Sequence, residues 1–235
     1  MRKLVTFLAV STSLLAAPAL AKDGAWYVGG DAGAMIVEDI GFDFGLAPTI
    51  PSSENAQVEL NHDYGFDAAL FVGYDLGAFR LEAEVAYKRA SVDDIETAIT
   101  IPAPAGPLPP GLHPAGGGST SALSFMINGM LDFGNEDGLS VFVGGGGGIA
   151  RIAYIDIRAF EDRDPYLDDG DTGFAWQLFT GVRVAISDKV DGTVRYRYFG
   201  ASGLTVPDIG GFDGKSSFQS HSVLAGITFN LGGPP

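Results

Sequence analysis

The 235-residue sequence contains no cysteine, few basic residues and, beyond its N-terminal segment, no long apolar run. Without cysteine the chain forms no disulfide, so its stability must come from backbone hydrogen bonds and packing. Lys and Arg number 14 against 29 Asp and Glu, a formal net charge of −15 at pH 7. This acidic surplus repels phosphates, which excludes a nucleic acid partner. After residue 22 no stretch offers the roughly 18 consecutive apolar residues of a membrane helix, which excludes a helical membrane protein.

The N-terminal segment has the layout of a secretory signal peptide. Arg2 and Lys3 precede an apolar stretch from Leu4 to Leu15, and Ala19-Leu20-Ala21 is a small-x-small cleavage site. We therefore expect residues 1–21 to be a signal peptide and the mature chain to be exported. Its removal lowers the Lys and Arg count from 14 to 12 against 29 Asp and Glu, so the formal charge moves from −15 to −17.

The segment FRLEAEVAYK, residues 79–88, alternates apolar and charged side chains. A period of two predicts a β-strand, because successive side chains point to opposite faces. One face carries Phe79, Leu81, Ala83, Val85 and Tyr87. The other face carries Arg80, Glu82, Glu84, Ala86 and Lys88. In a membrane barrel the apolar face meets lipid and the charged face lines the interior.

Seven further segments show the same pattern, and most supply the roughly 9–11 residues that a tilted membrane strand needs. They are residues 25–36, 64–76, 122–133, 139–154, 174–186, 190–199 and 222–231. Within the fifth of the eight, the alternation cannot be followed through Gly144–Gly148. Glycines inside a strand pattern indicate either a bulge or a crowded interior, and the sequence leaves both open.

The connections between these segments alternate between short and long. The short ones, 77–78, 134–138 and 187–189, consist of turn-forming residues. The long ones are residues 37–63, 89–121, 155–173 and 200–217. This alternation is typical of bacterial outer-membrane barrels, with short periplasmic turns and long extracellular loops. We predict an all-β fold, an eight-stranded antiparallel up-and-down transmembrane β-barrel spanning residues 22–231.

A soluble barrel of the lipocalin type, or a soluble sandwich, is the alternative, since a soluble barrel also tolerates alternating strands. Such a barrel has no need to sort its loops by length or to place aromatic residues at strand ends. Five aromatic residues lie near the predicted strand ends and match membrane-interface girdles. They are Trp26, Tyr87, Phe133, Phe174 and Tyr198.

Three segments, WYVGGDAGAMIVED, FRLEAEVAYKR and SHSVLAGITFNL, resemble the N-terminal transmembrane domain of OmpA-like outer-membrane proteins of the alphaproteobacterial type. The resemblance extends from about Ala25 to Leu231. It implies a Gram-negative outer membrane, with lipid and lipopolysaccharide as surroundings and the barrel-assembly machinery as a folding partner. Members of the family commonly continue through a Pro/Gly hinge into a peptidoglycan-binding domain. Residues 232–235, GGPP, look like the start of such a hinge, and we do not assign peptidoglycan binding to these 235 residues.

The predicted inward-facing positions carry charges of both signs. An eight-stranded barrel is about wide enough for its side chains to fill, and buried charges persist when they are paired. We expect a lumen ion-pair network, joined by Gln177, of Asp31, Asp67, Arg80, Glu82, Glu84, Lys88, Asp132, Arg183, Arg195 and Arg197. The network either fills the barrel structurally or forms a narrow gated pore in which one pair exchanges partners.

No motif in the sequence assigns a catalytic, cofactor or metal site. The acidic segment EDRDPYLDDGD, residues 161–171, departs from the calcium-loop pattern D-x-[DN]-x-[DN]-G. The three histidines, His62, His113 and His221, stand outside any catalytic motif. We therefore expect a structural, non-enzymatic envelope protein without cofactors. A low-conductance or gated porin-like channel is the first alternative, and a surface adhesin using the long loops is the second.

Overall fold

The computed structural model describes residues 24–42, 58–98, 100, 109–134, 138–159, 165, 167–207 and 213–232. Residues 1–21, which the sequence predicts to be a signal peptide, lie outside this set, as do most of the short connection 134–138 and part of the acidic segment 161–171. In the described part of the chain, no helix has the length and apolar character needed to cross a membrane. The strands there are β1 (Ala25–Val37), β2 (Ile40–Phe42), β3 (Val58–His62), β4 (Gly65–Asp75), β5 (Phe79–Thr97), β6 (Gly111–Pro114), β7 (Gly117–Gly134), β8 (Leu139–Arg158), β9 (Leu167–Ser187), β10 (Val190–Pro207) and β11 (Asp213–Asn230).

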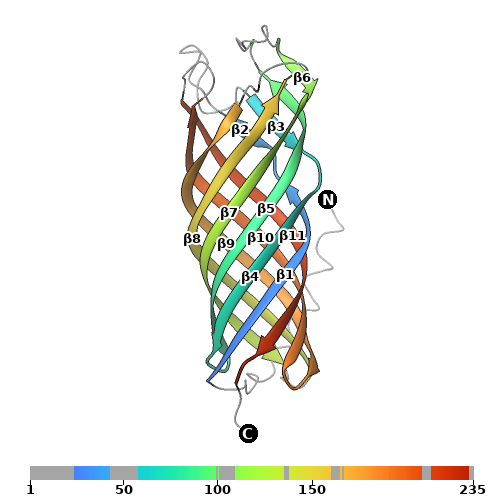
Figure 1. The fold of residues 1–235 in the computed structure, drawn as a ribbon, viewed down its shortest axis with the longest axis vertical. Coiled ribbons are helices and arrows are strands. Elements are labelled where there is room, and N and C mark those ends of the chain that lie inside the picture. The colour runs from blue at the N-terminus through green and yellow to red at the C-terminus, as the bar shows by residue number, and fades with distance from the viewer. Residues whose placement is uncertain are drawn as a thin grey trace, which may run out of the picture.

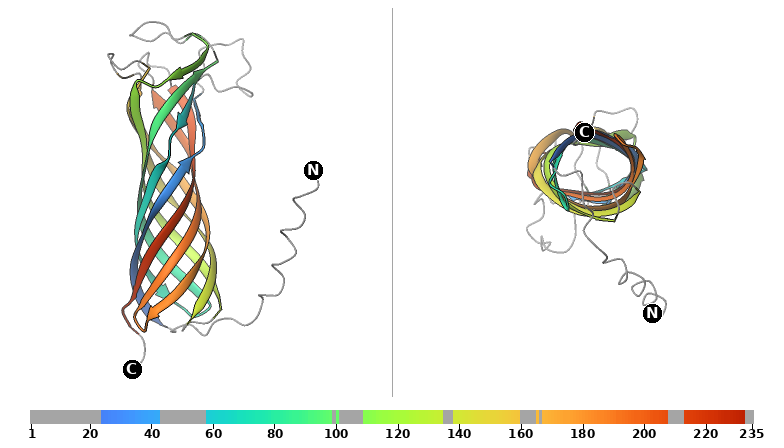
Figure 2. Two further views of the ribbon diagram at one scale, coloured as in Figure 1. Left: turned by 90° about the vertical axis from the view of Figure 1, so that its right-hand side faces the viewer. Right: turned by 90° about the horizontal axis from the view of Figure 1, so that it is seen from below.

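Eight of these strands form a closed ring in the order β1, β4, β5, β7, β8, β9, β10 and β11. Each strand is antiparallel to both neighbours, and β1 closes the ring on β11 with Ala32 opposite Ala225. Seen end-on, the ring is complete (Figure 2). A closed sheet leaves no ring strand with an unpaired edge. The predicted eight-stranded antiparallel barrel is confirmed.

One end of the barrel, here the turn end, carries tight connections (Figure 1). Between β4 and β5 the backbone N–H of Leu76 donates to the carbonyl of Phe79 at 2.9 Å. Gly77 has a φ of +98°, a value that favours glycine, and its N–H donates to Asp75 Oδ1 at 2.8 Å. These contacts fix the register of the hairpin, because a two- or three-residue turn leaves little freedom for the strands to slide.

At the opposite end, here the loop end, the predicted strand boundaries were wrong. The sequence placed loops at 37–63, 89–121, 155–173 and 200–217, yet β5, β7, β8, β9, β10 and β11 all continue into these segments. The short strands β2, β3 and β6 also lie there, with β3 and β6 pairing with the last residues of β5. The barrel wall therefore extends well past the predicted membrane strands.

The reason is a reversal of polarity along β5. From Phe79 to Lys88 the outward side chains are mostly apolar and the inward ones mostly charged. Beyond Lys88 the outward residues become Arg89, Ser91 and Asp93, whereas the inward ones become Ala90, Val92 and Ile95. A strand that leaves a membrane meets water on its outer face, so the apolar face must turn to the interior.

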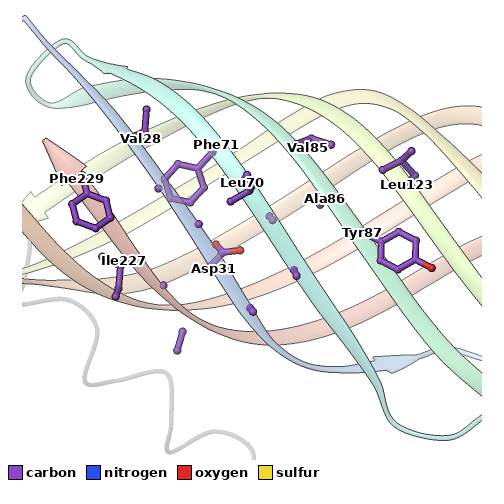
Figure 3. A pocket seen from close by; sticks show the side chains of 17 residues that line it. Val28, Asp31, Leu70, Phe71, Val85, Ala86, Tyr87, Leu123, Ile227 and Phe229 are labelled. Atoms are coloured by element: carbon purple, nitrogen blue, oxygen red, sulfur yellow. The ribbon is translucent and has the colours of Figure 1, made fainter. Parts of the chain in front are cut away.

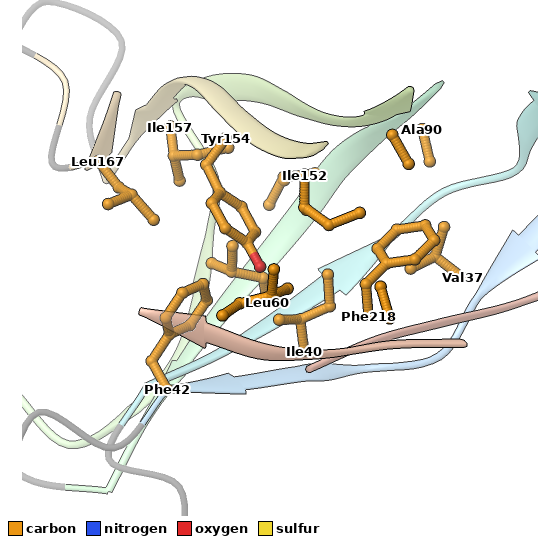
Figure 4. Packing of buried hydrophobic residues seen from close by; sticks show 14 of the residues in the cluster. Val37, Ile40, Phe42, Leu60, Ala90, Ile152, Tyr154, Ile157, Leu167 and Phe218 are labelled. Atoms are coloured by element: carbon orange, nitrogen blue, oxygen red, sulfur yellow. The ribbon is translucent and has the colours of Figure 1, made fainter. Parts of the chain in front are cut away.

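An apolar cluster, here the cap, fills the loop end of the barrel (Figure 4). Within it Phe42 and Tyr154 meet edge-to-face with ring centroids 5.0 Å apart, and Phe199 meets Phe218 at 6.1 Å. Each large apolar side chain buried in this way contributes about 1.5–3 kcal/mol. The principal cap residues, each at most 7% exposed, are Val37, Ile40, Phe42, Leu60, Val92, Ile95, Ile152, Tyr154, Ile157, Leu167, Leu204 and Phe218.

The glycine run of β8 is regular strand, which decides between the two readings that the sequence left open. Gly144–Gly148 pairs with β7 and β9 without a register shift, so the run contains no bulge. A Cβ on Gly146 would lie 2.0 Å from Asn128 Oδ1 and 2.5 Å from the carbonyl oxygen of Ile127. The inward glycines therefore leave room for side chains of neighbouring strands in a crowded interior.

Candidate functional site: the charged interior of the barrel

The ten charged residues predicted to face the interior all lie there, and each is at most 9% exposed. Five are acidic and five are basic, so their formal charges balance. They come from six of the eight ring strands and form three layers along the barrel axis. Buried charges on this scale require pairing, because an unpaired ion in a medium of low polarity costs several kcal/mol.

The layer nearest the turn end is centred on Asp132 of β7. Its Oδ1 accepts hydrogen bonds from Arg80 Nη2 at 2.9 Å and from Arg183 Nη2 at 3.0 Å. The Arg80 guanidinium also lies over the ring of Tyr27, 5.3 Å from its centroid. Arg80 belongs to β5 and Arg183 to β9, so one carboxylate of β7 holds arginines from two strands that are not neighbours in the ring.

The middle layer is centred on Glu84 of β5. Its Oε2 accepts hydrogen bonds from Arg197 Nη2 at 3.0 Å and from Asn128 Nδ2 at 3.3 Å. Its Oε1 accepts one from Gln177 Nε2 at 3.1 Å, and the same Nε2 lies 2.8 Å from Asn128 Oδ1. This carboxylate therefore links β5, β7, β9 and β10 across the interior.

The layer nearest the cap is centred on Asp67 of β4. Lys88 Nζ lies 2.7 Å from its Oδ2, and Arg197 Nη1 lies 3.2 Å from its Oδ1. Lys88 also sits over the ring of Phe199, 4.8 Å from the centroid. Phe199 belongs to the apolar cluster at the loop end, so the charged layers and the cap are contiguous.

Arg195 of β10 is held differently from the other interior arginines. Its guanidinium nitrogens lie 3.4 Å from Asp31, 3.7 Å from Glu82 and 3.6 Å from Glu84. These separations satisfy an ion pair but exceed a good hydrogen bond, and Nε and Nη1 form no hydrogen bond. The guanidinium also lies between three aromatic rings, at 5.4 Å, 5.4 Å and 4.8 Å from the centroids of Phe71, Phe142 and Phe179.

The strand alternation found most of this site, because a register of period two assigns every charge to the inner or outer face. Tyr27 and Asn128 share this inward parity but were not part of the predicted network, and the structure gives their partners: Tyr27 Oη donates to Glu82 Oε1 at 3.1 Å, and Asn128 Nδ2 donates to Glu84 Oε2. The cap was missed. Part of its signal was present in the sequence, since Val92 and Ile152 continue the inward parity with apolar residues. Ile95 has the opposite parity and faces inward only because the pairing of β3 with β5 shifts register after Val92.

The five aromatic residues predicted for the membrane interface all point outward from the strands. Trp26 is 57% exposed and Phe174 is 60% exposed, whereas Phe133 and Tyr198 are half-buried. Tyr198 stacks on His221 with ring centroids 4.7 Å apart, and Tyr87 lies beside Phe66. Their role at a membrane interface stays a prediction.

The three histidines have separate partners. His62 Nε2 lies 2.8 Å from Thr120 Oγ1, and His113 Nε2 lies 2.8 Å from the carbonyl oxygen of Pro109. His221 joins Glu38 Oε1 and Tyr196 Oη, each at 2.7 Å, on the outside of the barrel near the loop end. Among the described residues, no three or more His, Asp or Glu side chains gather in a way that would hold a metal ion.

Comparison with known proteins places this architecture in context. A family model described as an outer membrane protein beta-barrel domain matches residues 7–230. The crystal structure of Neisserial surface protein A has a TM-score of 0.52 at 18% identity, covering 89% of this chain and all of that one. The outer membrane protein OprG from Pseudomonas aeruginosa has a TM-score of 0.50 at 11% identity, covering 88% of this chain and 96% of that one. No curated protein sequence matches the chain.

Proposed function

Because the chain belongs to the outer membrane protein β-barrel domain family, we propose that it is a structural barrel, closed to ions, that contributes to the integrity of the bacterial envelope. The resemblance of the sequence to OmpA-like barrels is thereby confirmed at the level of the family. The protein is a bacterial outer-membrane barrel. We propose that the turn end faces the periplasm and the loop end the outside, because short connections are typical of the periplasmic side.

The observation that carries the proposal is the filled interior. An eight-stranded barrel leaves a space only about as wide as its inward side chains. Here that space holds the five predicted acids and five predicted bases, together with Asp191 of β10, followed by the cap. An ion that crossed would have to displace the ion pairs around Glu84 and Asp67 and then pass an apolar cluster that offers it no ligands.

The outer surface supports the same role. Leu70, Ile127 and Leu178 from three different strands are 68%, 63% and 57% exposed, although they are large and apolar. Such residues are costly in water and favourable against lipid chains. The protein would thus contribute to the envelope by presenting a lipid-matched wall. Its delivery to the membrane by the barrel-assembly machinery belongs to this proposal.

Single-channel recording tests the closed interior. The folded mature chain would be reconstituted in a planar bilayer, with folding verified by the heat-sensitive mobility of the barrel on a gel. We expect no conductance steps. Reproducible steps from a preparation that is fully folded would contradict the closed interior.

A charge-removal variant sharpens this test. Glu82→Gln with Glu84→Gln removes two carboxylates from the interior, and Glu96→Gln, exposed at the loop end, is the control. If the interior is closed structurally, neither variant opens it while the barrel stays folded. If the unaltered protein conducts and only the double variant changes the step size, the carboxylates of β5 line an ion path.

A gated low-conductance channel is the second candidate, and the position of Arg195 favours it. This guanidinium is shared by Asp31, Glu82 and Glu84 at distances beyond good hydrogen bonds, so an exchange among them breaks no strong contact. Under this reading, replacing Arg195 by Lys changes the open probability, while Arg183→Lys at the turn-end layer does not. A surface-binding role for the loop end and the lack of catalysis stay predictions from the sequence.

A further inference from the structure

A groove of about 1080 Å³ lies on the lipid-facing side of the barrel, across β11, β1, β4, β5 and β7 (Figure 3). Its floor is formed by small outward-facing residues on three adjacent strands: Gly30, Ala32, Ala68 and Ala225. Ala32 lies directly between Ala68 and Ala225 in the strand register, so the small residues form one continuous depression.

Large apolar side chains form the walls of the groove. Ile227 and Phe229 stand on the β11 side, and Leu70, Val85 and Tyr87 stand on the β4 and β5 side. In the strand register Gly30 lies between Ile227 and Leu70. At this level Gly30 therefore forms the floor of the groove, and the two large side chains form its walls. Such a lining suits an alkyl chain, because it offers apolar contact on three sides and few polar groups.

Two arginines lie beside the end of this groove that is nearer the loop end. Arg89 follows Tyr87 on the outer face of β5, about 7 Å farther along the strand. Arg151 of β8 lies opposite Leu123, which lies opposite Tyr87, so it is about 10 Å across the sheet from Tyr87. Tyr87, Leu123 and the two arginines thus form one outward-facing patch.

The two arginines also stand at the edge of the apolar belt. Arg89 is the next outward residue after Tyr87, the last large apolar residue on the outer face of β5 in this direction. Arg151 is the next outward residue after Ile149 on β8, beyond which that face carries Ala153 and the half-buried Ile155. This is the level at which the polar groups of outer-leaflet lipids begin.

Both arginines are free to accept a ligand. Each is exposed, and within the described parts of the chain neither forms a hydrogen bond or an ion pair through its side chain. Five basic residues are in the interior, and among the described basic residues outside it Arg158 pairs with Asp156, whereas the two arginines, like Lys189 and Lys215, have no side-chain partner. Unpaired guanidinium groups at this depth are complementary to phosphate, which arginine binds in a bidentate manner.

We propose that the groove and the two arginines form a binding site for the lipid A part of lipopolysaccharide. An acyl chain lies over Gly30, Ala32 and Ala68, and a phosphate group pairs with Arg89 and Arg151. The occupant is an amphiphile because the surface itself has an apolar groove and a cationic end. A second copy of the barrel is the alternative occupant of the groove, and its binding would not depend on a phosphate group.

Native mass spectrometry of the folded full chain, released from detergent micelles, tests the site directly. Diphosphorylated lipid A, the same lipid with its phosphates removed, phosphatidylglycerol and inorganic phosphate would be titrated separately. We expect one diphosphorylated lipid A per barrel, with at least about tenfold weaker binding after phosphate removal, as expected for the loss of charge-assisted contacts. Inorganic phosphate alone should not compete, because it makes no contact in the groove.

Three variants locate the bound lipid. Arg89→Gln with Arg151→Gln removes the phosphate contacts, and Ala32→Phe fills the groove with an apolar ring that remains compatible with lipid. Lys189→Gln with Lys215→Gln removes the same total charge from exposed positions away from the groove. We expect the first two to weaken lipid A binding by about tenfold or more and the third to leave it unchanged.

The proposal is overturned if the phosphate-free lipid binds as well, if both charge variants weaken binding equally, or if Ala32→Phe has no effect. A dimer peak that Ala32→Phe abolishes would overturn it in favour of a second copy as the occupant. All variants are compared only as folded barrels, judged by their heat-sensitive mobility. The inference rests on the outer-membrane location and not on a closed interior, so the lipid titration and the conductance recording fail independently.

Discussion

Lys88 and Arg89 are consecutive residues of β5, and they lie on opposite sides of the barrel wall at the level where the strand changes character. Lys88 is fully buried with its Nζ 2.7 Å from Asp67 Oδ2, whereas Arg89 is exposed on the outer face. On the turn side of this pair the charges are inside, and on the loop side they are outside. The pair therefore marks where β5 leaves the hydrocarbon part of the membrane.

This boundary makes a lysine scan of the outer face of β5 informative. Ala83→Lys places a charge against lipid and is expected to lower the free energy of unfolding by about 2–3 kcal/mol. Ser91→Lys, on the same face but beyond Arg89, is expected to change it by less than about 0.5 kcal/mol. Equilibrium urea unfolding in phospholipid vesicles measures both, and equal costs at the two positions would place the boundary elsewhere.

The contact between Asp67 and Lys88 predicts a coupled response. Lys88→Met leaves Asp67 buried with Arg197 as its remaining cation, and we expect a loss of about 3 kcal/mol in unfolding free energy. Asp67→Asn leaves Lys88 unpaired and should cost a similar amount. The double variant should cost less than the sum by about 1–3 kcal/mol, because the two residues share one interaction. Additive losses in urea unfolding would mean that the two groups do not interact energetically.

The glycine run of β8 predicts opposite outcomes for two adjacent substitutions. A methyl group on Gly146 meets Asn128 Oδ1 and a backbone carbonyl, so Gly146→Ala is expected to cost about 1–3 kcal/mol. Gly147 faces outward, where the nearest atoms to an added Cβ belong to Phe174 at 3.8 Å. Gly147→Ala should therefore be neutral or slightly stabilising, since alanine restricts the unfolded chain. The midpoints of urea unfolding decide between them, and a similar loss at both positions would contradict the crowded interior.

The loop end should lose stability in mild acid through His62. Burial lowers the pKa of this imidazole to about 4 from its ordinary 6.5. Between these pH values the unfolded state binds more protons than the folded one, so stability falls as pH drops from about 6.5 to about 4. A shift of this size corresponds to roughly 3 kcal/mol, and no contribution from His62 is expected above pH 6.5.

Limited proteolysis of the loop end as a function of pH measures this effect. In His62→Gln, whose amide replaces the ring beside Thr120, the acid-dependent part of the cleavage rate should disappear. His113→Gln, at β6, serves as the matched loss of a histidine at the same end. If the acid sensitivity persists in His62→Gln, another group is responsible for it.

The sequence by itself determined the ring of strands and the side on which each charge lies. In FRLEAEVAYK the period of two fixes Arg80, Glu82, Glu84 and Lys88 on one face, and the alternation of short and long connections indicates an outer-membrane barrel. This information is local, because side-chain direction in a strand depends only on the parity of the residue. It is also why the inward set could be named without knowing any of its contacts.

Only the tertiary structure decided which charges meet and where the strands end. Glu84 and Arg197 are 113 residues apart, and their contact depends on the register of every strand pair between them. The continuation of β5 to Thr97 was missed because a reversal of polarity resembles the end of a strand until an interior is known to receive Val92 and Ile95. The cap and the lipid-facing groove likewise arise from side chains of several strands, whose proximity no single segment of sequence specifies.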